Sequence, residues 1–277
     1  MKPPGLPLSH AVGLGIVQGP TEVLPVSSSG HLVLVPAMLD LPYSRLEPEL
    51  RKSFEVALHA GTAVGLVVAM RGQVAAKARE MGPAGFARLG LTFIPAAAAG
   101  LAFERPIERR LGSPRYVAAA QVVAGAALWA ADSRGGTRPE SSAGWRDAFW
   151  IGLGQAAALV PGVSRGGATL TAARLLGFSR PASASLSRQA ALPVIAGATA
   201  LKGVRLSRSG LPPGLAKPFA AGALAALGST LVSARFTGVL EGRHSLAPVA
   251  AYRIGLGLAA SARLRRLRPP HGVESIT

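Results

Sequence analysis

The sequence contains no cysteine among its 277 residues. Disulfide bonds, thiolate metal sites and cysteine nucleophiles are therefore excluded. Charged residues are also scarce, at 16% of the chain against roughly 25% in an average soluble protein. Together with a mean hydropathy of +0.35, this shortage excludes intrinsic disorder and a fibrous fold, and it indicates that lipid is part of the chain's surroundings.

Acidic residues are few as well, with 13 Asp and Glu against 30 Lys and Arg, which gives a formal net charge of +17. In a soluble protein this excess would indicate a nucleic-acid partner. Here no basic run is interleaved with the aromatic residues that a base-stacking platform needs, so we expect no nucleic-acid binding. The basic residues instead cluster between apolar blocks, which is typical of loops that face an anionic cytoplasmic leaflet. The clusters are Arg71, Lys77, Arg79 and Arg88; Arg105, Arg109, Arg110 and Arg115; and Arg263, Arg265, Arg266 and Arg268.

Apolar blocks with few charges recur along the chain. Most are shorter than the ~20 residues that a straight membrane span requires, so some are expected to be half-spans. Their small residues suit close helix packing in lipid, and a soluble bundle with so many blocks would have little sequence left for a solvated surface. No A-x-A cleavage site follows the first block, which we expect to stay in the mature protein. The blocks are Leu8–Leu24, Ser29–Leu41, Phe54–Met70, Leu91–Phe103, Tyr116–Ala131, Ala148–Val160, Ala190–Val204, Phe219–Ala234 and Ala247–Ala262.

Two of these segments resemble each other. Residues 15–30 and 152–167 share Gly, Gln, Val, Val, Ser and Gly at a constant offset, which is the separation of Gln18 and Gln155. A repeat of interrupted apolar segments at about half the chain length predicts duplicated halves, inverted in the membrane, whose broken helices meet near the midplane.

Polar residues gather at both interrupted segments, where Pro20, Pro25 and Pro161 break helices. Non-helical backbone at membrane depth is tolerated only where it is buried in protein or lines a cavity. Arg165 offers a fork of donors for phosphate oxygens, and neighbouring glycines let backbone N–H groups approach an anion. The first segment adds a hydroxyl or imidazole nucleophile and a carboxylate, so the two segments together indicate phosphoryl transfer. These polar residues are Gln18, Glu22, Ser27, Ser28, Ser29 and His31 in the first segment and Ser164, Arg165 and Thr169 in the second.

Structural interpretations remain open for several of these residues. Glu22 and Arg165 can form a structural ion pair, and any serine of the run Ser27–Ser29 can simply cap the helix that follows. The histidines outside these segments are interpreted as packed or solvated, except His59, whose role is ambiguous. No P-loop, dinucleotide-binding loop, HExxH or G-x-S-x-G sequence is present.

The two segments closely resemble motifs of the bacterial undecaprenyl-diphosphate phosphatase family. The first motif is Glu or Gln, three residues, then Glu, leading into Leu-Pro-Val-Ser-Ser-x-Gly-His, and it matches residues 18–31. The second, Pro-Gly-x-Ser-Arg-Ser-Gly-x-Thr, matches residues 161–169. Weaker matches, Phe-Glu-Val at 54–56 and Ala-Tyr-Arg at 251–253, extend the resemblance over most of the chain.

This resemblance implies a membrane enzyme that hydrolyses undecaprenyl diphosphate to undecaprenyl phosphate and phosphate, which recycles the peptidoglycan lipid carrier and confers bacitracin resistance. It implies a divalent cation, Mg²⁺ or Ca²⁺, with Glu22 as a metal ligand, and it allows a homodimer. The nucleophile stays open among Ser28, His31 and water. The catalytic residues that the resemblance implies are Glu22, Ser28, His31 and Arg165, and the substrate-binding residues are Gln18, Ser27, Ser164, Gly166, Gly167 and Thr169.

Two positions depart from the family pattern. Gly166 stands where the family usually has Ser, which removes a hydroxyl but allows a closer approach of a backbone N–H. Ser185 stands where the family tends to have Glu, so a carboxylate is missing. These departures leave open a degenerate relative that binds lipid phosphate without cleaving it. An undecaprenyl phosphate transporter or flippase also stays open, because inverted repeats and broken helices are the architecture of secondary carriers as well. The His-x-x-x-Asp sequence of the other membrane lipid-phosphatase family does not follow Arg165.

We therefore predict an all-α, polytopic integral membrane helix bundle with two re-entrant helical hairpins in inverted-topology repeats. Residues 1–277 are expected to form a single membrane domain with repeat halves of approximately 8–131 and 148–262 and a basic tail at 263–277. The Arg71–Arg88 loop is expected to be cytoplasmic, because it holds four basic residues and a single acid, Glu80. The expected location is the bacterial inner membrane, with the site open to the external face.

Overall fold

The computed structural model describes residues 5–191, 197, 214–235 and 244–267. Within these ranges the chain is helical and forms no strand, apart from one isolated β-bridge between Arg138 and Phe178. This confirms the prediction of an all-α fold. The elements are α1 (Leu8–Val23), α2 (Ser28–Met38), η1 (Pro42–Arg45), α3 (Pro48–Glu80), α4 (Pro83–Leu111), α5 (Pro114–Ser133), η2 (Glu140–Ser142), α6 (Trp145–Ala157), α7 (Arg165–Leu175), α9 (Ala216–Ala234) and α11 (Ala247–Arg266).

Most predicted apolar blocks lie on these helices, and two differences have a physical cause. Helix α7 lies outside every predicted block because its eleven residues are rich in Gly, Thr and Arg; it forms because the Ser164 hydroxyl caps its first turn. The last helix is also longer than its apolar block, which ends at Ala262, because α11 continues to Arg266 with arginines in its last turn, where cations suit the negative end of a helix dipole. The block Ala190–Val204 lies almost wholly outside the described residues.

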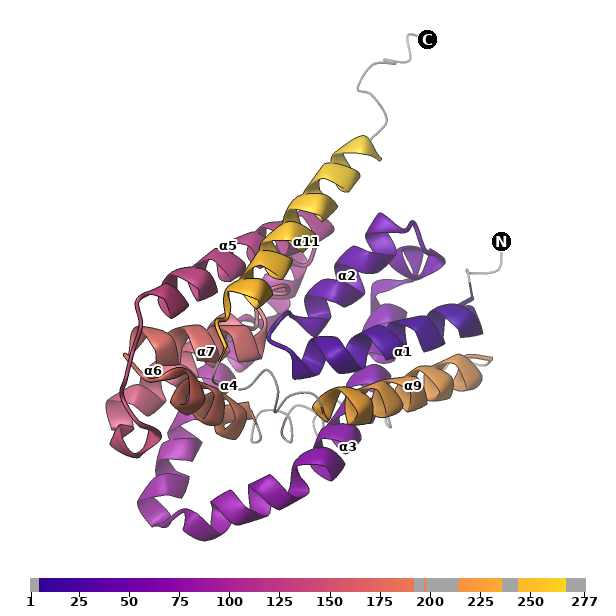
Figure 1. The fold of residues 1–277 in the computed structure, drawn as a ribbon. Helices are drawn as coiled ribbons and strands as arrows, with labels where there is room; N and C mark the ends of the chain where they lie inside the picture. Colours follow the sequence, from indigo (N-terminus) through magenta and orange to yellow (C-terminus); the bar gives the residue numbers. More distant parts are fainter. Residues whose placement is uncertain (1–4, 192–196, 198–213, 236–243, 268–277) are drawn as a thin grey trace, which may run out of the picture.

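The helices pack in pairs that bring distant parts of the chain together (Figure 1). Helix α1 lies along α9, α4 lies along α6, and α5 lies along α11. Glycines allow this close approach. A Cβ added at Gly257 of α11 would lie 2.6 Å from the Ala118 carbonyl of α5, and one at Gly125 of α5 would lie 3.1 Å from the Ala250 carbonyl of α11. The small residues therefore set the distance between helices, as expected for packing in lipid.

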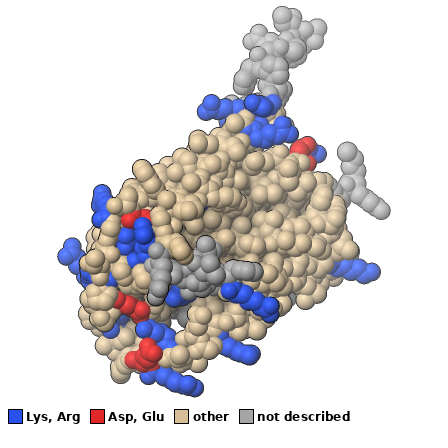
Figure 2. All heavy atoms as spheres, viewed as in Figure 1, with Lys and Arg blue, Asp and Glu red and all other residues tan. Residues whose placement is uncertain are grey.

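The outer surface suits a membrane. Helices α3 and α4 are each long and apolar enough to cross a bilayer. Helix α4 directs large apolar side chains outward, with exposed fractions of 59% for Ile94, 89% for Leu101 and 57% for Phe103. Figure 2 shows a broad uncharged surface with Lys and Arg gathered at its margins, including the C-terminal end of α11. Such a surface is costly in water and favourable against lipid.

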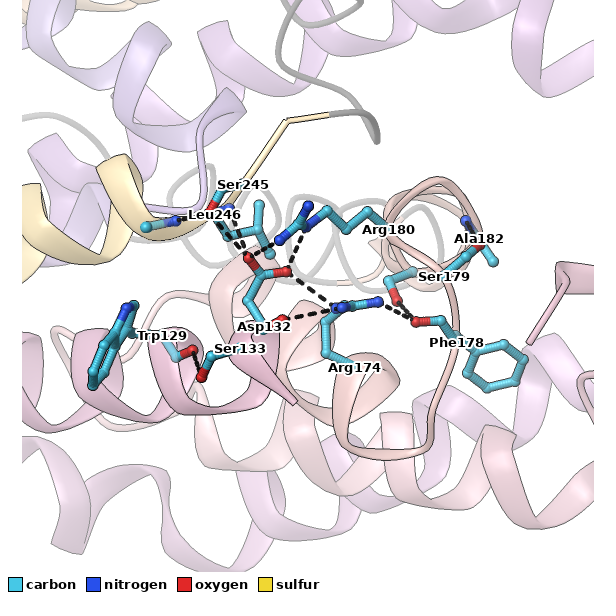
Figure 3. Close-up of polar contacts among 12 residues, drawn as sticks. Trp129, Asp132, Ser133, Arg174, Phe178, Ser179, Arg180, Ala182, Ser245 and Leu246 are labelled. Carbon is cyan, nitrogen blue, oxygen red and sulfur yellow. Dashed lines mark hydrogen bonds and ion pairs between the residues drawn. The ribbon is translucent and has the colours of Figure 1, made fainter. Parts of the chain in front are cut away.

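A cluster of polar groups ties α5, α7 and α11 together (Figure 3). Asp132, near the end of α5, is buried and accepts two hydrogen bonds of 2.8 Å from the Arg180 guanidinium. Its carboxylate also lies 3.1 Å from Arg174 Nε of α7 and accepts a 3.0 Å hydrogen bond from the backbone N–H of Leu246, which precedes α11. These contacts fix the position at which α11 begins, and α11 carries Tyr252 and Arg253, which reach the segments around the helix breaks described next.

Candidate active site

Two helix breaks carry the polar segments that the sequence singles out. The first break, residues 24–27, separates α1 from α2, and the second, residues 158–164, separates α6 from α7. Each ends in a serine with left-handed backbone, Ser27 at φ 76° and Ser164 at φ 63°. Each serine hydroxyl accepts a 3.2 Å hydrogen bond from a backbone N–H three residues later, that of Gly30 or Gly167. Ser27 and Ser164 are separated along the chain by the same number of residues as Gln18 and Gln155, and so are Gly30 and Gly167. The sequence repeat is therefore also a repeat of local structure.

The breaks lie against each other. A Cβ added at Gly166 would lie 3.7 Å from the Pro25 Cβ, so the N-terminus of α7 approaches the first break. Unbonded N–H groups and the positive end of the dipole make a helix N-terminus an anion site. Two such termini, those of α2 and α7, begin beside the same cavity.

This cavity has a volume of about 1060 Å³ and is lined by both breaks together with α3 and α4. Six of the predicted site residues line it: Glu22, Ser27, Ser28, Ser164, Arg165 and Gly166. Leu32, Val33 and Leu66 add an apolar wall, so the cavity combines polar groups with surface suited to a hydrocarbon chain.

Glu22 is the centre of the polar contacts. Its Oε2 accepts a 2.6 Å hydrogen bond from Ser28 Oγ and a 3.3 Å one from Gln18 Nε2. Its Oε1 lies 3.5 Å from Arg165 Nη2, and Oε2 lies 3.7 Å from His59 Nε2. The Glu22–Arg165 ion pair is therefore present, and it joins the two halves of the chain across the cavity. A carboxylate at 2.6 Å from a hydroxyl is within the range at which it can act as a general base.

His31 is placed differently from the other predicted catalytic residues. It is buried, it does not line the cavity, and its ring stacks on Tyr252 of α11 at a centroid distance of 5.7 Å. Nδ1 lies 2.8 Å from the Ser27 carbonyl oxygen, which can only accept, so Nδ1 donates. In the neutral ring Nε2 then accepts from the Tyr252 hydroxyl at 2.7 Å. The structure therefore brings Glu22, Ser28 and Arg165 together and places His31 behind Ser27.

Gln18, Gly167 and Thr169 lie around the cavity without lining it. Thr169 Oγ1 lies within hydrogen-bonding distance of the Arg165 carbonyl at 3.0 Å and pairs with Ser187 Oγ at 2.6 Å, so it steadies the first turn of α7. Gln18 is fully buried and orients Glu22. These residues support the ones that face the cavity.

The oxygen atoms beside Glu22 supply only some of the ligands that a divalent cation requires. Gln18 Oε1 is buried beside Glu22 and has no hydrogen-bond partner in the described structure, so one amide and one carboxylate oxygen are available there. No group of three His, Cys, Asp or Glu side chains suited to a metal occurs among the described residues.

Three residues that contact the site or its surroundings are not assigned to it by the sequence pattern. His59 was ambiguous because a lone histidine in an apolar block gives no sign that it faces Glu22. Tyr252 and Arg253 were noted only as part of a weak family match, and the structure shows both reaching the segments around the breaks from α11. The signal that could have found them is the polar Tyr-Arg pair inside an apolar block.

Comparison with known proteins agrees with the resemblance. The family model described as bacitracin resistance protein BacA matches residues 11–259. The undecaprenyl-diphosphatase of Geobacter sulfurreducens is 40% identical over 270 residues, covering 93% of this chain and 98% of that protein. That of Trichlorobacter lovleyi is 37% identical over 271 residues, covering 93% and 97%. A match of this extent along both chains shows that the protein belongs to the bacitracin resistance protein BacA family.

Proposed function

We propose that this protein is a membrane undecaprenyl-diphosphatase, which hydrolyses undecaprenyl diphosphate to undecaprenyl phosphate and phosphate and thereby confers bacitracin resistance. One observation carries the proposal beyond family membership. Ser28, Glu22 and Arg165, which flank two separate helix breaks, meet at one cavity where two helix N-termini begin. This combination supplies a nucleophile, a base and a phosphate-binding cation in one place.

The diphosphate binds with its terminal phosphate between the N-termini of α2 and α7. Arg165 and the backbone N–H groups in the first turns of α2 and α7 neutralise its negative charge, and Ser164 completes the phosphate-binding site. The prenyl chain leaves along the apolar wall that includes Leu32 and Leu66. Charge neutralisation and in-line positioning supply most of the acceleration in phosphoryl transfer, so little more is required of the protein.

Ser28 is the nucleophile that the geometry supports best, because its hydroxyl lies 2.6 Å from the Glu22 carboxylate and faces the cavity. Glu22 takes the hydroxyl proton as Oγ forms a bond to the terminal phosphorus and the bridging P–O bond breaks, releasing undecaprenyl phosphate. Water then attacks the phosphoserine: the bond between phosphorus and Oγ breaks, the protonated Glu22 returns its proton to Ser28 Oγ, and the attacking water gives a proton to the phosphate that is released. His31 holds the backbone of Ser27 in place. A divalent cation held by Glu22 and Gln18 would neutralise phosphate charge.

The same geometry supports a membrane arrangement. We propose α1–α2 and α6–α7 as the re-entrant hairpins, because their helices are each too short to cross ~30 Å of hydrocarbon. The equal spacing of the serine caps, and the matching pairs α1 with α9 and α6 with α4, support inverted repeats within one membrane domain. We place the protein in the inner membrane as a multi-pass enzyme.

The orientation rests on the two ends of α3 and α4. The basic Arg71–Arg88 segment lies where these helices join, and positive charge favours the cytoplasm. Lys52 near the start of α3 and Glu108 near the end of α4 line the cavity and are partly exposed, so they mark its mouth at the opposite ends of these helices. We therefore propose that the cavity opens to the external face and that Arg105 and Arg109, which line it, serve the anionic substrate and do not mark a cytoplasmic loop.

The function is tested by phosphate release from undecaprenyl diphosphate by the detergent-purified protein, with and without EDTA. We expect release that Ser28→Ala, Glu22→Gln and Arg165→Ala each reduce by about 10²-fold or more. Ser44→Ala is the matched control, because the Ser44 hydroxyl belongs to the same cavity wall but donates only to the Leu41 carbonyl. Lipid transport in proteoliposomes without phosphate release would instead identify a flippase, and lipid binding without turnover a degenerate relative.

The nucleophile is tested by acid quenching with substrate labelled at the terminal phosphate. Phosphoserine survives acid, whereas phosphohistidine does not. We expect an acid-stable label on the wild-type chain that His31→Ala retains and Ser28→Ala loses. A label that is acid-labile, or that persists in Ser28→Ala, would contradict this assignment.

A further inference from the structure

Arg253, on α11, is fully buried, and its guanidinium contacts both helix breaks. Nη1 donates to the Pro25 carbonyl at 3.3 Å, and Nη2 donates to the Gly162 and Val163 carbonyls, each at 2.9 Å. Nε donates to Gln121 Oε1 at 3.0 Å. None of these acceptors is a carboxylate. A buried cation that binds only neutral acceptors is costly, so a role that depends on its geometry is expected.

Gln121, on α5, completes the network and is also fully buried. Its Oε1 orients Arg253, and its Nε2 donates to the Val26 carbonyl at 2.8 Å. We call Gln121 and Arg253 the carbonyl clamp. The carbonyl clamp holds two backbone carbonyls of the first break and two of the second, and these would otherwise lack donors at membrane depth.

One glycine in each half leaves room for the carbonyl clamp. A Cβ added at Gly30 would lie 2.6 Å from Gln121 Nε2, and one added at Gly167 would collide with Arg253 Nη1. The two glycines occupy equivalent positions of the sequence repeat, and neither lines the cavity. The requirement for glycine at these positions therefore comes from the carbonyl clamp behind the breaks.

We propose that the carbonyl clamp is a positioning device for the reaction. It fixes the separation of the two breaks, and with it the distance between the Ser28–Glu22 pair and Arg165. This inference rests on the proposed function. By binding the break carbonyls from behind, the carbonyl clamp leaves the N–H groups of α2 and α7 available to the phosphate. A misplacement of about 1 Å in such a site can cost about 100-fold in rate.

The absence of cysteine makes the separation of the breaks directly measurable. The 3.7 Å between a Cβ at Gly166 and the Pro25 Cβ matches the ~3.5–4.5 Å that a disulfide requires. The double variant Pro25→Cys, Gly166→Cys in the full chain therefore reports how close the breaks lie, independently of catalysis. We expect the double variant to form its disulfide rapidly. We expect slower formation when Arg253→Met is added, because Met has an unbranched apolar side chain of similar shape but none of the N–H donors of Arg253.

The kinetic test combines the same changes. Arg253→Met alone is expected to lower kcat about 100-fold with little change in KM, and Arg253→Lys to be intermediate, because an ammonium cannot span the carbonyls of both breaks. In the triple variant, oxidation is expected to restore kcat well above that of the reduced form, since the disulfide takes over from the missing donors. The oxidised and reduced double variants with Arg253 intact are the reference.

The positioning role would be overturned if Arg253→Met left the cross-linking rate unchanged and lowered kcat in a way that oxidation did not restore. The loss of kcat would then be due to the charge of Arg253 alone. If Arg253→Met does not fold, Gln121→Glu is used, which retains the acceptor for Arg253 but removes the donor to Val26. Slower cross-linking in that variant supports the proposal, and an unchanged rate overturns it. If the wild-type chain releases no phosphate, the proposed function fails, while the cross-linking rates still decide whether the carbonyl clamp sets the geometry.

Discussion

At the residue scale, the site depends on the shape of Arg165 as well as on its charge. Its guanidinium lies 3.5 Å from Glu22 and faces the cavity. A guanidinium binds two phosphate oxygens side by side, whereas an ammonium binds as a point charge. We expect Arg165→Lys to lower kcat/KM for phosphate release by more than about tenfold, which corresponds to about 1.4 kcal/mol. Activity within tenfold of wild type would contradict bidentate binding.

Two neighbouring glycines offer a matched pair of variants. A Cβ at Gly167 would collide with Arg253 and lie 3.2 Å from the Pro25 carbonyl, whereas a Cβ at Gly166 has its nearest neighbour at 3.7 Å. We expect Gly167→Ala to destabilise the fold by about 1–3 kcal/mol, as overpacking does, and Gly166→Ala to keep the wild-type melting temperature. Thermal unfolding in detergent measures both. Equal melting temperatures would show that the Arg253 side chain can move aside.

The sequence identifies the candidate residues of the site but not the directions of their side chains. Glu22, Ser28 and Arg165 stand out because charged and hydroxyl groups are rare in and beside apolar blocks. Nothing in the Ser-Ser-Gly-His run shows that Ser28 faces the cavity while His31 faces Tyr252. That difference arises from the left-handed backbone of Ser27, which begins α2 at one particular rotation.

At the element scale, the cluster around Asp132 holds the ends of α5 and α7 to the start of α11 (Figure 3). Removing one partner of a buried ion pair leaves the other charges uncompensated, at a cost of about 3–5 kcal/mol. We expect Asp132→Ala to lower the melting temperature markedly. Asp40→Ala is the control, because the Asp40–Arg45 pair is 61% and 63% exposed and should contribute about 0–1 kcal/mol. Equal effects of the two variants would rule out a structural role for the Asp132 cluster.

Ser185, which stands where the family tends to have Glu, lies beside a carboxylate from another element. Glu140 of η2 accepts a 2.8 Å hydrogen bond from Gln189 Nε2 and pairs with Lys77 Nζ at 2.7 Å, and Ser185 also hydrogen-bonds to it. Ser185 does not line the cavity. The departure at Ser185 therefore lies in a separate polar cluster that joins η2 to α3 and to the helical residues 180–191.

This cluster predicts a pH dependence of stability. Burial alone would raise the pKa of Glu140, but hydrogen bonds from Lys77, Ser185 and Gln189 outweigh it and hold the pKa below the ordinary 4.5. A carboxyl group with a lowered folded-state pKa stabilises the fold above its unfolded pKa and loses that contribution as the pH falls through the folded-state value. We expect Glu140→Gln to lower the melting temperature at pH 7 and to leave it unchanged at the acidic end of a titration. An equal decrease at all pH values would show that the charge of Glu140 is not involved.

At the scale of the whole molecule, the proposed orientation predicts which ends of the helices are accessible from outside. Ser113 lies exposed at the cavity mouth, and Gly82 lies exposed at the junction of α3 and α4 with open space around it. In intact cells we expect an impermeant maleimide to label Ser113→Cys at once and Gly82→Cys only after the membrane is permeabilised. The cysteine-free chain is the blank. The reverse pattern would place the cavity on the cytoplasmic side.

The sequence by itself determined the all-α class, the two interrupted segments and the constant offset between them, because composition, helix breakers and cap serines act locally. It also predicts which residues carry the chemistry, because ionisable groups at membrane depth are costly and persist only where they have a role. Only the tertiary structure decided that α5 and α11 deliver Gln121 and Arg253 to the breaks and that Glu22 meets Arg165 across the cavity. These contacts join residues that lie far apart along the chain, so they depend on how whole helices pack, which no local pattern encodes.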